Sequence, residues 1–135
     1  MKIMVIMQGH SGSGKSTLAK TIAHVLDAEI CSADNFFMNG DKYEFDARFL
    51  GQAHAACRMA VGLYITNAKN VVVDNTNTRN WEAAPYVKMG LEHGYTIKFV
   101  RATGNFPNVH GVPNEVVQAM KDRMEDLSIE ECLRC

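Results

Sequence analysis

Proline, tryptophan and long apolar runs are scarce in this sequence. Its 135 residues include three prolines, one tryptophan and ten glycines. So little proline and glycine excludes a low-complexity chain, and an apolar fraction of 47% is too high for a disordered one. No apolar run approaches the ~18 residues that a membrane helix needs. The composition therefore indicates a globular domain without a membrane span.

The sequence also has no excess of one charge sign. Fourteen Lys and Arg residues against fifteen Asp and Glu residues give a net charge of -1. A protein that coats nucleic acid through a broad basic surface is therefore not expected, although a local basic groove is compatible with this balance.

Cysteines are few and widely spaced, at Cys31, Cys57, Cys132 and Cys135. Only the last two are close, and a zinc site needs two further ligands near them, so we expect no metal there. The short apolar run at the N-terminus lacks the features of a secretory signal, which favours a cytoplasmic protein with reduced thiols. The stretch from about 128 to 135 follows the last apolar stripe, and we expect a loose tail that is dispensable for catalysis.

Short β-branched runs alternate with longer helical patterns along one domain, residues 1–135. The predicted strands are Lys2–Met7, Ala28–Cys31, Asn70–Asp74 and Tyr95–Arg101. The predicted helices are Ser16–Leu26, Asp46–Thr66, Thr78–His93 and a last helix from Pro113 with a stripe of Val116, Val117, Met120, Met124 and Leu127. Between them, 34–45 is expected to be irregular and about 102–113 a loop. This order predicts a three-layer α/β fold with a mostly parallel sheet.

The strongest motif is a phosphate loop, G-x-x-x-x-G-K-[ST], between the first predicted strand and the first predicted helix. Its residues and the one after it are Gly9, His10, Ser11, Gly12, Ser13, Gly14, Lys15, Ser16 and Thr17. The glycines let the backbone point N–H groups inward at phosphate, and the helix N-terminus adds positive charge. Lys15 can reach the β- and γ-phosphates of ATP, and Ser16 can place its hydroxyl on Mg²⁺. We therefore expect nucleoside triphosphate binding.

Two aspartates follow predicted strands and should lie at the same sheet edge as the phosphate loop. Asp34 follows the second strand, where its carboxylate can accept the proton of an attacking hydroxyl or can cap a turn. Asp74 ends the third strand, where it can hold a water on Mg²⁺ or can stabilise an Asx turn. The guanine-reading motif Asn-Lys-x-Asp of GTPases does not occur, so a small kinase is favoured over a GTPase.

Four stretches together resemble the polynucleotide-kinase-like branch of P-loop kinases. In chain order they are GHSGSGKST, SADNFF, VVVDNTNTRNWE and NVHGVP. The resemblance implies Mg²⁺-dependent transfer of the ATP γ-phosphate to a hydroxyl, commonly the 5′-hydroxyl of DNA or RNA. It implies that Asp34 is the general base and that Asp74, Thr76 and Asn77 lie beside the acceptor. It also makes the loop at about 102–113 a short lid.

The chain departs from the family pattern in its arginines. Phe36 and Phe37 follow Asp34 where a bacteriophage member of this family has an arginine, and the lid before His110 contains no arginine. The candidate substitutes are Arg79, Arg101 and Arg123. We expect Arg101 to act on the nucleotide phosphates and Arg79 on an acceptor phosphate, with a solvated surface role as the alternative for each.

Aromatic residues gather after Asp34 and can either stack on a single-stranded base or pack in the core. They are Phe36, Phe37, Tyr43 and Phe45, and Trp81 in the first turn of its helix has the same two options. His110 in the lid could touch a nucleotide. The sequence thus predicts an ATP-dependent kinase whose acceptor is a nucleic-acid 5′-hydroxyl. The alternatives are a kinase of a free nucleoside, nucleotide or modified base, and a nucleotide-binding interaction protein with little catalysis.

Overall fold

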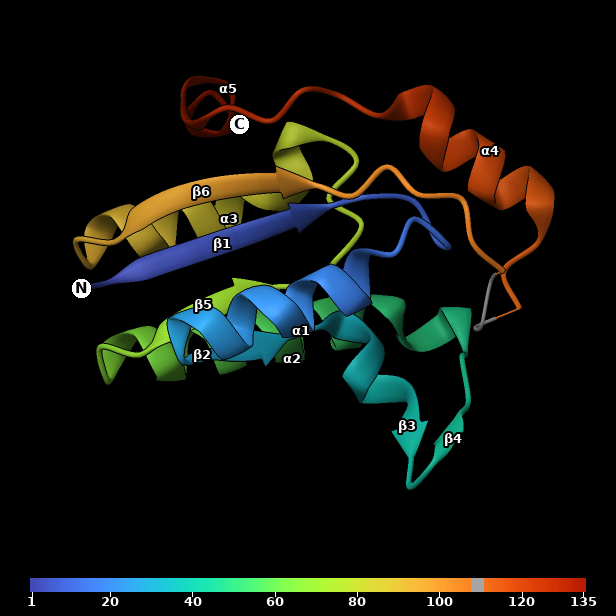
Figure 1. Cartoon of the computed structure of the whole chain (residues 1–135), viewed down its shortest axis with the longest axis horizontal. Helices are drawn as coiled ribbons and strands as arrows, with labels where there is room; N and C mark the ends of the chain where they lie inside the picture. The colour runs from blue at the N-terminus through green and yellow to red at the C-terminus, as the bar shows by residue number, and fades with distance from the viewer. Residues whose placement is uncertain (108–110) are drawn as a thin grey trace.

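A computed structural model describes residues 1–107 and 111–135, and its centre is a parallel sheet. The strands are β1 (Ile3–Gln8), β2 (Ala28–Cys31), β5 (Asn70–Val73) and β6 (Thr96–Arg101), in the spatial order β2-β5-β1-β6 (Figure 1). β5 and β6 flank β1, and β2 pairs with β5, all in parallel. The expected parallel α/β architecture is confirmed.

Helices cover both faces of this sheet. The helices are α1 (Lys15–Leu26), α2 (Leu50–Thr66), α3 (Asn80–Glu92), α4 (Asn114–Arg123) and α5 (Ile129–Leu133). α1 lies on one face, and α2 and α3 lie on the other, which gives three layers (Figure 1). None of the helices in the described part of the chain is long and apolar enough to cross a membrane.

Alternation along β1 explains why it is apolar on both faces. Met4 and Ile6 point into the core shared with α2 and α3, whereas Val5 and Met7 point into the core shared with α1. All four are at most 3% exposed, and burying such a side chain contributes roughly 1.5–3 kcal/mol. The apolar run at the N-terminus is therefore a central strand of the sheet, as predicted, and its carboxyl end leads into the phosphate loop.

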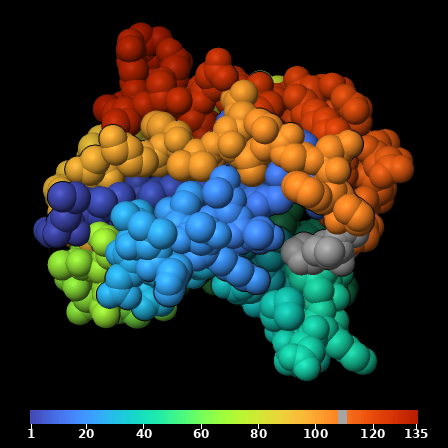
Figure 2. Space-filling model, viewed as in Figure 1, coloured from blue at the N-terminus to red at the C-terminus, as the bar shows by residue number. Residues whose placement is uncertain are grey.

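The segment expected to be irregular contains a small hairpin. A 3₁₀ turn (Ala33–Phe37) leads into β3 (Met38–Asn39) and β4 (Lys42–Tyr43), which pair around a turn in which Gly40 has φ 63°. The hairpin projects from the body of the molecule (Figure 2). A second 3₁₀ turn, Ala47–Phe49, follows, so the next helix begins at Leu50 rather than at Asp46.

The C-terminal region differs most from the sequence-based expectation. α4 ends at Arg123 and buries none of its residues, so Met124 and Leu127 do not continue a stripe on it. Leu127 instead packs against the core directly. The expected loose tail is wrong, because it forms α5 and its Cys132 is 0% exposed in the core beside α3.

Candidate nucleotide-binding site

The phosphate loop turns the chain from the end of β1 into α1. Gly12 and Gly14 have φ values of 85° and 83°, a conformation that L side chains rarely adopt. The Gly14 carbonyl accepts from Leu18 N at 3.1 Å, which starts the helix. Gly9 N donates to Thr76 O at 3.1 Å, so the loop is tied to the segment that follows β5. This geometry is suited to cradling phosphate groups.

Lys15, Ser16 and Asp74 form one polar cluster at the sheet edge. Lys15 Nζ lies 2.9 Å from Asp74 Oδ1, and Ser16 Oγ donates to Asp74 Oδ2 at 3.0 Å. The Lys15 and Asp74 side chains are only 11% and 8% exposed. The structure thus brings Asp74, at the end of the predicted third strand, together with two residues of the phosphate loop. A hydroxyl and a carboxylate side by side also fit Mg²⁺, which prefers oxygen ligands and keeps several waters.

Asp34 lies in the 3₁₀ turn after β2, where Tyr43 of the hairpin contacts it. Tyr43 donates its O–H to Asp34 Oδ1 at 3.0 Å. Burial, with the Asp34 charge as a further cause, raises the pKa of Tyr43, so the phenol stays a donor. The cap of this turn is Ser32, whose Oγ accepts from Asp34 N at 3.2 Å. The Asp34 carboxylate is therefore not needed as the cap of its own turn.

The segment after β5 uses its asparagines inside the protein. Asn75 Oδ1 accepts from Ala33 N at 2.8 Å, and Asn77 Nδ2 donates to Met7 O at 2.8 Å. Asn77 has φ 44° and is 1% exposed, whereas Thr76 is half-buried. The two amides tie the carboxyl ends of three strands together. Sequence reasoning missed Asn75, although an Asn-rich turn at a sheet edge is a usable signal.

The three candidate arginines all have partners from distant segments. Arg101 Nε donates to Gln8 Oε1 at 2.6 Å, and its Nη2 lies 2.9 Å from Asp126 Oδ1. Arg123 Nε donates to Thr78 Oγ1 at 3.0 Å. The structure places both at the carboxyl edge, where they join strand ends to the C-terminal region.

Arg79 is the least engaged of the three. Its Nη1 lies 3.6 Å from Glu125 Oε2, an ion pair in which both side chains are more than 40% exposed. Such a pair contributes little to stability. Its guanidinium therefore remains accessible to solvent on the same side of the molecule as the start of α3.

A segment that we call the strap, residues 102–106, lies against the phosphate loop. Gly104 N donates to Ser13 O at 2.9 Å, and Phe106 N donates to Gly12 O at 2.7 Å. A Cβ on Gly14 would lie 3.0 Å from Phe106 Cε2, so the ring packs directly on that glycine. Because the strap bonds carbonyl groups of the loop, loop N–H groups stay available for phosphate. No motif in the sequence predicts this contact, and His110 lies outside the described residues.

Known proteins share sequence with most of the chain. A family model described as an AAA domain matches residues 4–103. NEDD4-binding protein 2 of Homo sapiens is 31% identical over 134 residues, which cover 91% of this chain and 8% of that protein. The chain therefore spans less than a tenth of the length of this relative.

Solved structures share the fold. Kti12 of Chaetomium thermophilum, in complex with ADP-AlF3, has a TM-score of 0.69 at 12% identity and covers 91% of this chain and 80% of its own. The APS kinase CysC of Mycobacterium tuberculosis has a TM-score of 0.57 at 20% identity, and the match covers 93% of this chain and 98% of that one. A chain of the Pnkp1/Rnl/Hen1 complex has a TM-score of 0.61 at 20% identity, and the match covers 87% of this chain and 38% of that one. At these identities the likeness shows the fold alone.

The sequence match includes every part of the site that the strands position. The phosphate loop, Asp34, Asp74 and the end of β6 at Arg101 all lie within the matched residues. The matched range also holds the whole parallel sheet, whose fold is that of P-loop kinases. The chain belongs to the family whose model is described as an AAA domain.

Proposed function

We propose that the chain is an ATP-dependent kinase that transfers the γ-phosphate to a hydroxyl group. The observation that carries this proposal is the cluster of Lys15, Ser16 and Asp74, with Asp34 following a neighbouring strand at the same sheet edge. Family membership and the fold shared with an APS kinase support it.

In this proposal Ser16 and Asp74 hold Mg²⁺, Asp74 through a water molecule. Bound there, the ion would neutralise charge on the β- and γ-phosphates. Lys15 would leave Asp74 Oδ1 and bind the same phosphates as a point cation, and N–H groups of the phosphate loop other than those of Gly9 and Ser13 would cradle them.

Asp34 is the proposed general base, and Tyr43 holds its carboxylate in place. Arg101 is the proposed cation for the nucleotide phosphates and Arg79 for an acceptor phosphate. The Arg101 Nη2 group would have to give up the Asp126 carboxylate, whose side chain is 97% exposed, and the Glu125 carbonyl oxygen, to which it donates at 3.0 Å. The ion pair with Asp126 costs little to break.

We propose a nucleic-acid 5′-hydroxyl as the acceptor, held beside Asp74, Thr76 and Arg79. The buried Asn77 would position this segment through its hydrogen bond to Met7 O. Exposed aromatic rings near Asp34 support a single-stranded acceptor, because bases can stack on them. Phe36 and Phe45 are 43% and 53% exposed, whereas Phe37 is buried beneath them. The likeness to a chain of the Pnkp1/Rnl/Hen1 complex and the motif resemblance agree with this acceptor.

The test is transfer of labelled γ-phosphate to 5′-hydroxyl DNA and RNA, mononucleotides and nucleosides. We expect oligonucleotides to be the best acceptors. Asp34→Asn should keep nucleotide affinity and lower transfer by roughly 10²–10⁴. Lys15→Ala should abolish transfer, because it removes the cation from the redistributing phosphate charge.

Each other outcome points to a different function. Transfer to nucleosides or mononucleotides alone would indicate a small-molecule kinase. ATP binding without transfer to any acceptor would contradict the kinase proposal and favour a nucleotide-binding interaction protein. Near-normal turnover by Lys15→Ala would contradict the assignment of the phosphate loop.

A further inference from the structure

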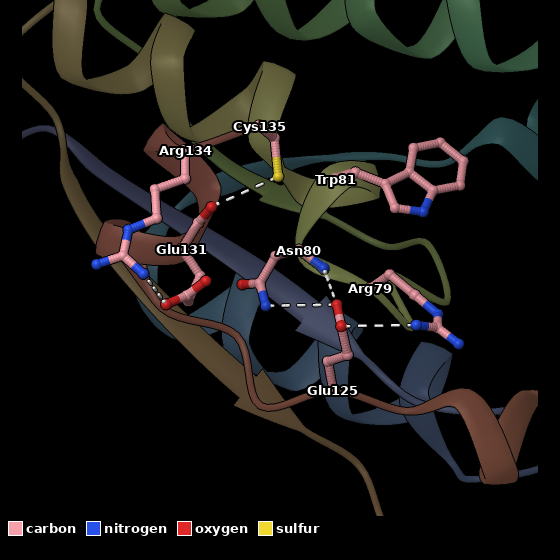
Figure 3. Close-up of a pocket in the computed structure, with 7 residues that line it drawn as sticks. All are labelled: Arg79, Asn80, Trp81, Glu125, Glu131, Arg134 and Cys135. Atoms are coloured by element: carbon pink, nitrogen blue, oxygen red, sulfur yellow. Dashed lines mark hydrogen bonds and ion pairs between the residues drawn. The ribbon is translucent and has the colours of Figure 1, made fainter.

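A cavity of about 380 Å³ opens at the start of α3, separate from the phosphate loop. It is bounded by Arg79, Asn80 and Trp81 on one side, by Glu125 below and by the end of α5 on the other side (Figure 3). Its three walls come from segments far apart in the sequence, so only the folded chain contains it.

The floor of this cavity is fixed by Asn80. Glu125 Oε1 accepts from Asn80 N at 2.9 Å, which satisfies the first N–H of α3, and Ser128 N donates to Asn80 Oδ1 at 3.0 Å. The Cys132 thiol lies 3.6 Å from Asn80 O and is fully buried. The hydrogen-bonded floor keeps the cavity open in a defined shape.

Two side chains at the rim are available to a ligand. Trp81 is 65% exposed, and its indole and the Arg79 guanidinium project to the same side of the cavity (Figure 3). Arg79 forms the long ion pair with Glu125 described above, and within residues 1–107 and 111–135 the Trp81 indole has no hydrogen bond or ring contact. An exposed indole beside a guanidinium combines a stacking surface with a phosphate ligand.

We propose that this cavity binds the second nucleotide of a single-stranded acceptor, with its base on Trp81 and its phosphate on Arg79. The proposal rests on the kinase function proposed above and names the acceptor class more closely. Arg79 and Trp81 directly follow in the chain the 74–78 segment that we place beside the acceptor, which connects this cavity to the proposed acceptor site. Arg79 supplies one phosphate contact, which suits a chain with a net charge of -1 and no long basic track.

Trp81 is the sole tryptophan, so its fluorescence reports this cavity directly. The measurement is equilibrium binding of thymidine and of 5′-hydroxyl oligothymidylates of two to six nucleotides, without ATP, at several salt concentrations. We expect quenching that begins with the dinucleotide. Trp81→Leu should weaken binding of labelled oligonucleotide, followed by anisotropy, by roughly 5- to 150-fold, and Trp81→Phe should restore most of it. Arg79→Gln should weaken oligonucleotide binding and make the slope of log K against log salt concentration shallower by about 0.7.

Arg134→Gln is the matched control. Arg134 lines the same cavity and carries the same charge, but its guanidinium lies 2.9 Å from Glu131 Oε1 and 2.8 Å from Glu130 Oε1. We expect its loss to leave oligonucleotide binding unchanged. Unfolding in urea checks that each variant is folded.

The failure of this inference differs from failure of the kinase proposal. Equal oligonucleotide affinity in Trp81→Leu and the parent, or binding without quenching, would overturn the inference while leaving transfer activity intact. An equal loss of thymidine and oligonucleotide binding would overturn the second-nucleotide assignment. If oligonucleotides quench the fluorescence but the protein transfers phosphate to no acceptor, the proposed binding cavity is supported and the kinase proposal is overturned.

Discussion

At the scale of single residues, the phosphate loop contains one buried hydroxyl without a partner. Ser13 is 3% exposed, and its Oγ is the unsatisfied buried side-chain N or O atom within residues 1–107 and 111–135. A buried polar group without a hydrogen bond is destabilising. The loop therefore gives up stability at this position.

Ser13→Ala should raise the free energy of unfolding by about 1 kcal/mol, measured by urea denaturation. Ser32→Ala is the control of opposite sign, because the Ser32 hydroxyl accepts from Asp34 N and its loss should cost ~0.5–2 kcal/mol. A destabilised Ser13→Ala variant would mean that the hydroxyl has a partner in solution.

Tyr43 is the residue that the structure adds to the proposed catalytic machinery. Tyr43→Phe removes the 3.0 Å hydrogen bond to Asp34 while keeping the ring that packs on Phe37 and Phe45. We expect phosphate transfer to fall roughly tenfold through loss of positioning, with nucleotide affinity unchanged. Steady-state kinetics and equilibrium binding of ATP test the two halves, and a kcat equal to that of the parent would exclude the positioning role.

At the scale of elements, the strap depends on a glycine that has no room for a side chain. A Cβ on Gly104 would lie 2.7 Å from the Ser13 carbonyl oxygen and would also overlap the Phe106 ring. Backbone at that distance cannot yield cheaply, so the strap must lift when a methyl group is added.

Gly104→Ala should therefore speed hydrogen exchange at the Gly104 and Phe106 amides, which bond to the loop carbonyls. Gly62→Ala in α2 is the control, because nothing lies within 4 Å of its Cβ position. It should leave exchange at the strap amides no faster and raise the free energy of unfolding by roughly 0.5–1 kcal/mol, since alanine favours a helix over glycine. Unchanged exchange in Gly104→Ala would show that the strap is already detached in solution.

The C-terminal element gives a second prediction at this scale. Cys132 is fully buried against α3, whereas Cys135 three residues later is exposed. Cys132→Ala should lower the free energy of unfolding by about 1 kcal/mol through lost packing, and Cys135→Ala should leave it unchanged. Equal stability of the two variants in urea would mean that α5 is undocked.

Elements were predictable from sequence where local pattern decides them. The local sequence is enough to predict β5, from its Val-Val-Val run, and the phosphate loop, from its glycines. The prediction for the C-terminal region was wrong because the residues that this region contacts are distant in the sequence. Glu125 is held by Asn80, 45 positions earlier, and this contact ends the helical path that Met124 and Leu127 would otherwise extend. The partners of Arg101, and the residues of the phosphate loop that the strap contacts, are likewise distant in the sequence.

At the scale of the whole molecule, parallel strands explain why the site lies at one edge. The phosphate loop, Asp34, Asp74 and Arg101 each stand at or just after the carboxyl end of a strand, and those ends coincide in a parallel sheet. This convergence was predictable from residue order. The direction of each side chain was not, since it depends on tertiary hydrogen bonds.

The four thiols report on the integrity of this whole arrangement. Cys31 and Cys57 line a cavity of about 280 Å³ between β2 and α2, yet they are only 3% and 4% exposed. Burial is the main cause that raises the pKa of Cys31 to about 12, and burial likewise raises the pKa of Cys132 to about 11. Because the thiolate is the reactive form, Cys31 and Cys132 should be inert at pH 8 while the fold is intact, and burial keeps the reagent from Cys57.

A pulse of N-ethylmaleimide at pH 8, read by intact mass, should therefore modify one thiol per native chain, Cys135, and all four in urea. Slower modification of the other three requires opening of the structure. Ligand that binds only the folded state at about 100 times its Kd stabilises it by about 2.7 kcal/mol. MgATP at that level should then slow modification through global unfolding by roughly 100-fold, and Lys15→Ala should lose this protection. Protection by MgATP that persists in Lys15→Ala would place the nucleotide away from the phosphate loop.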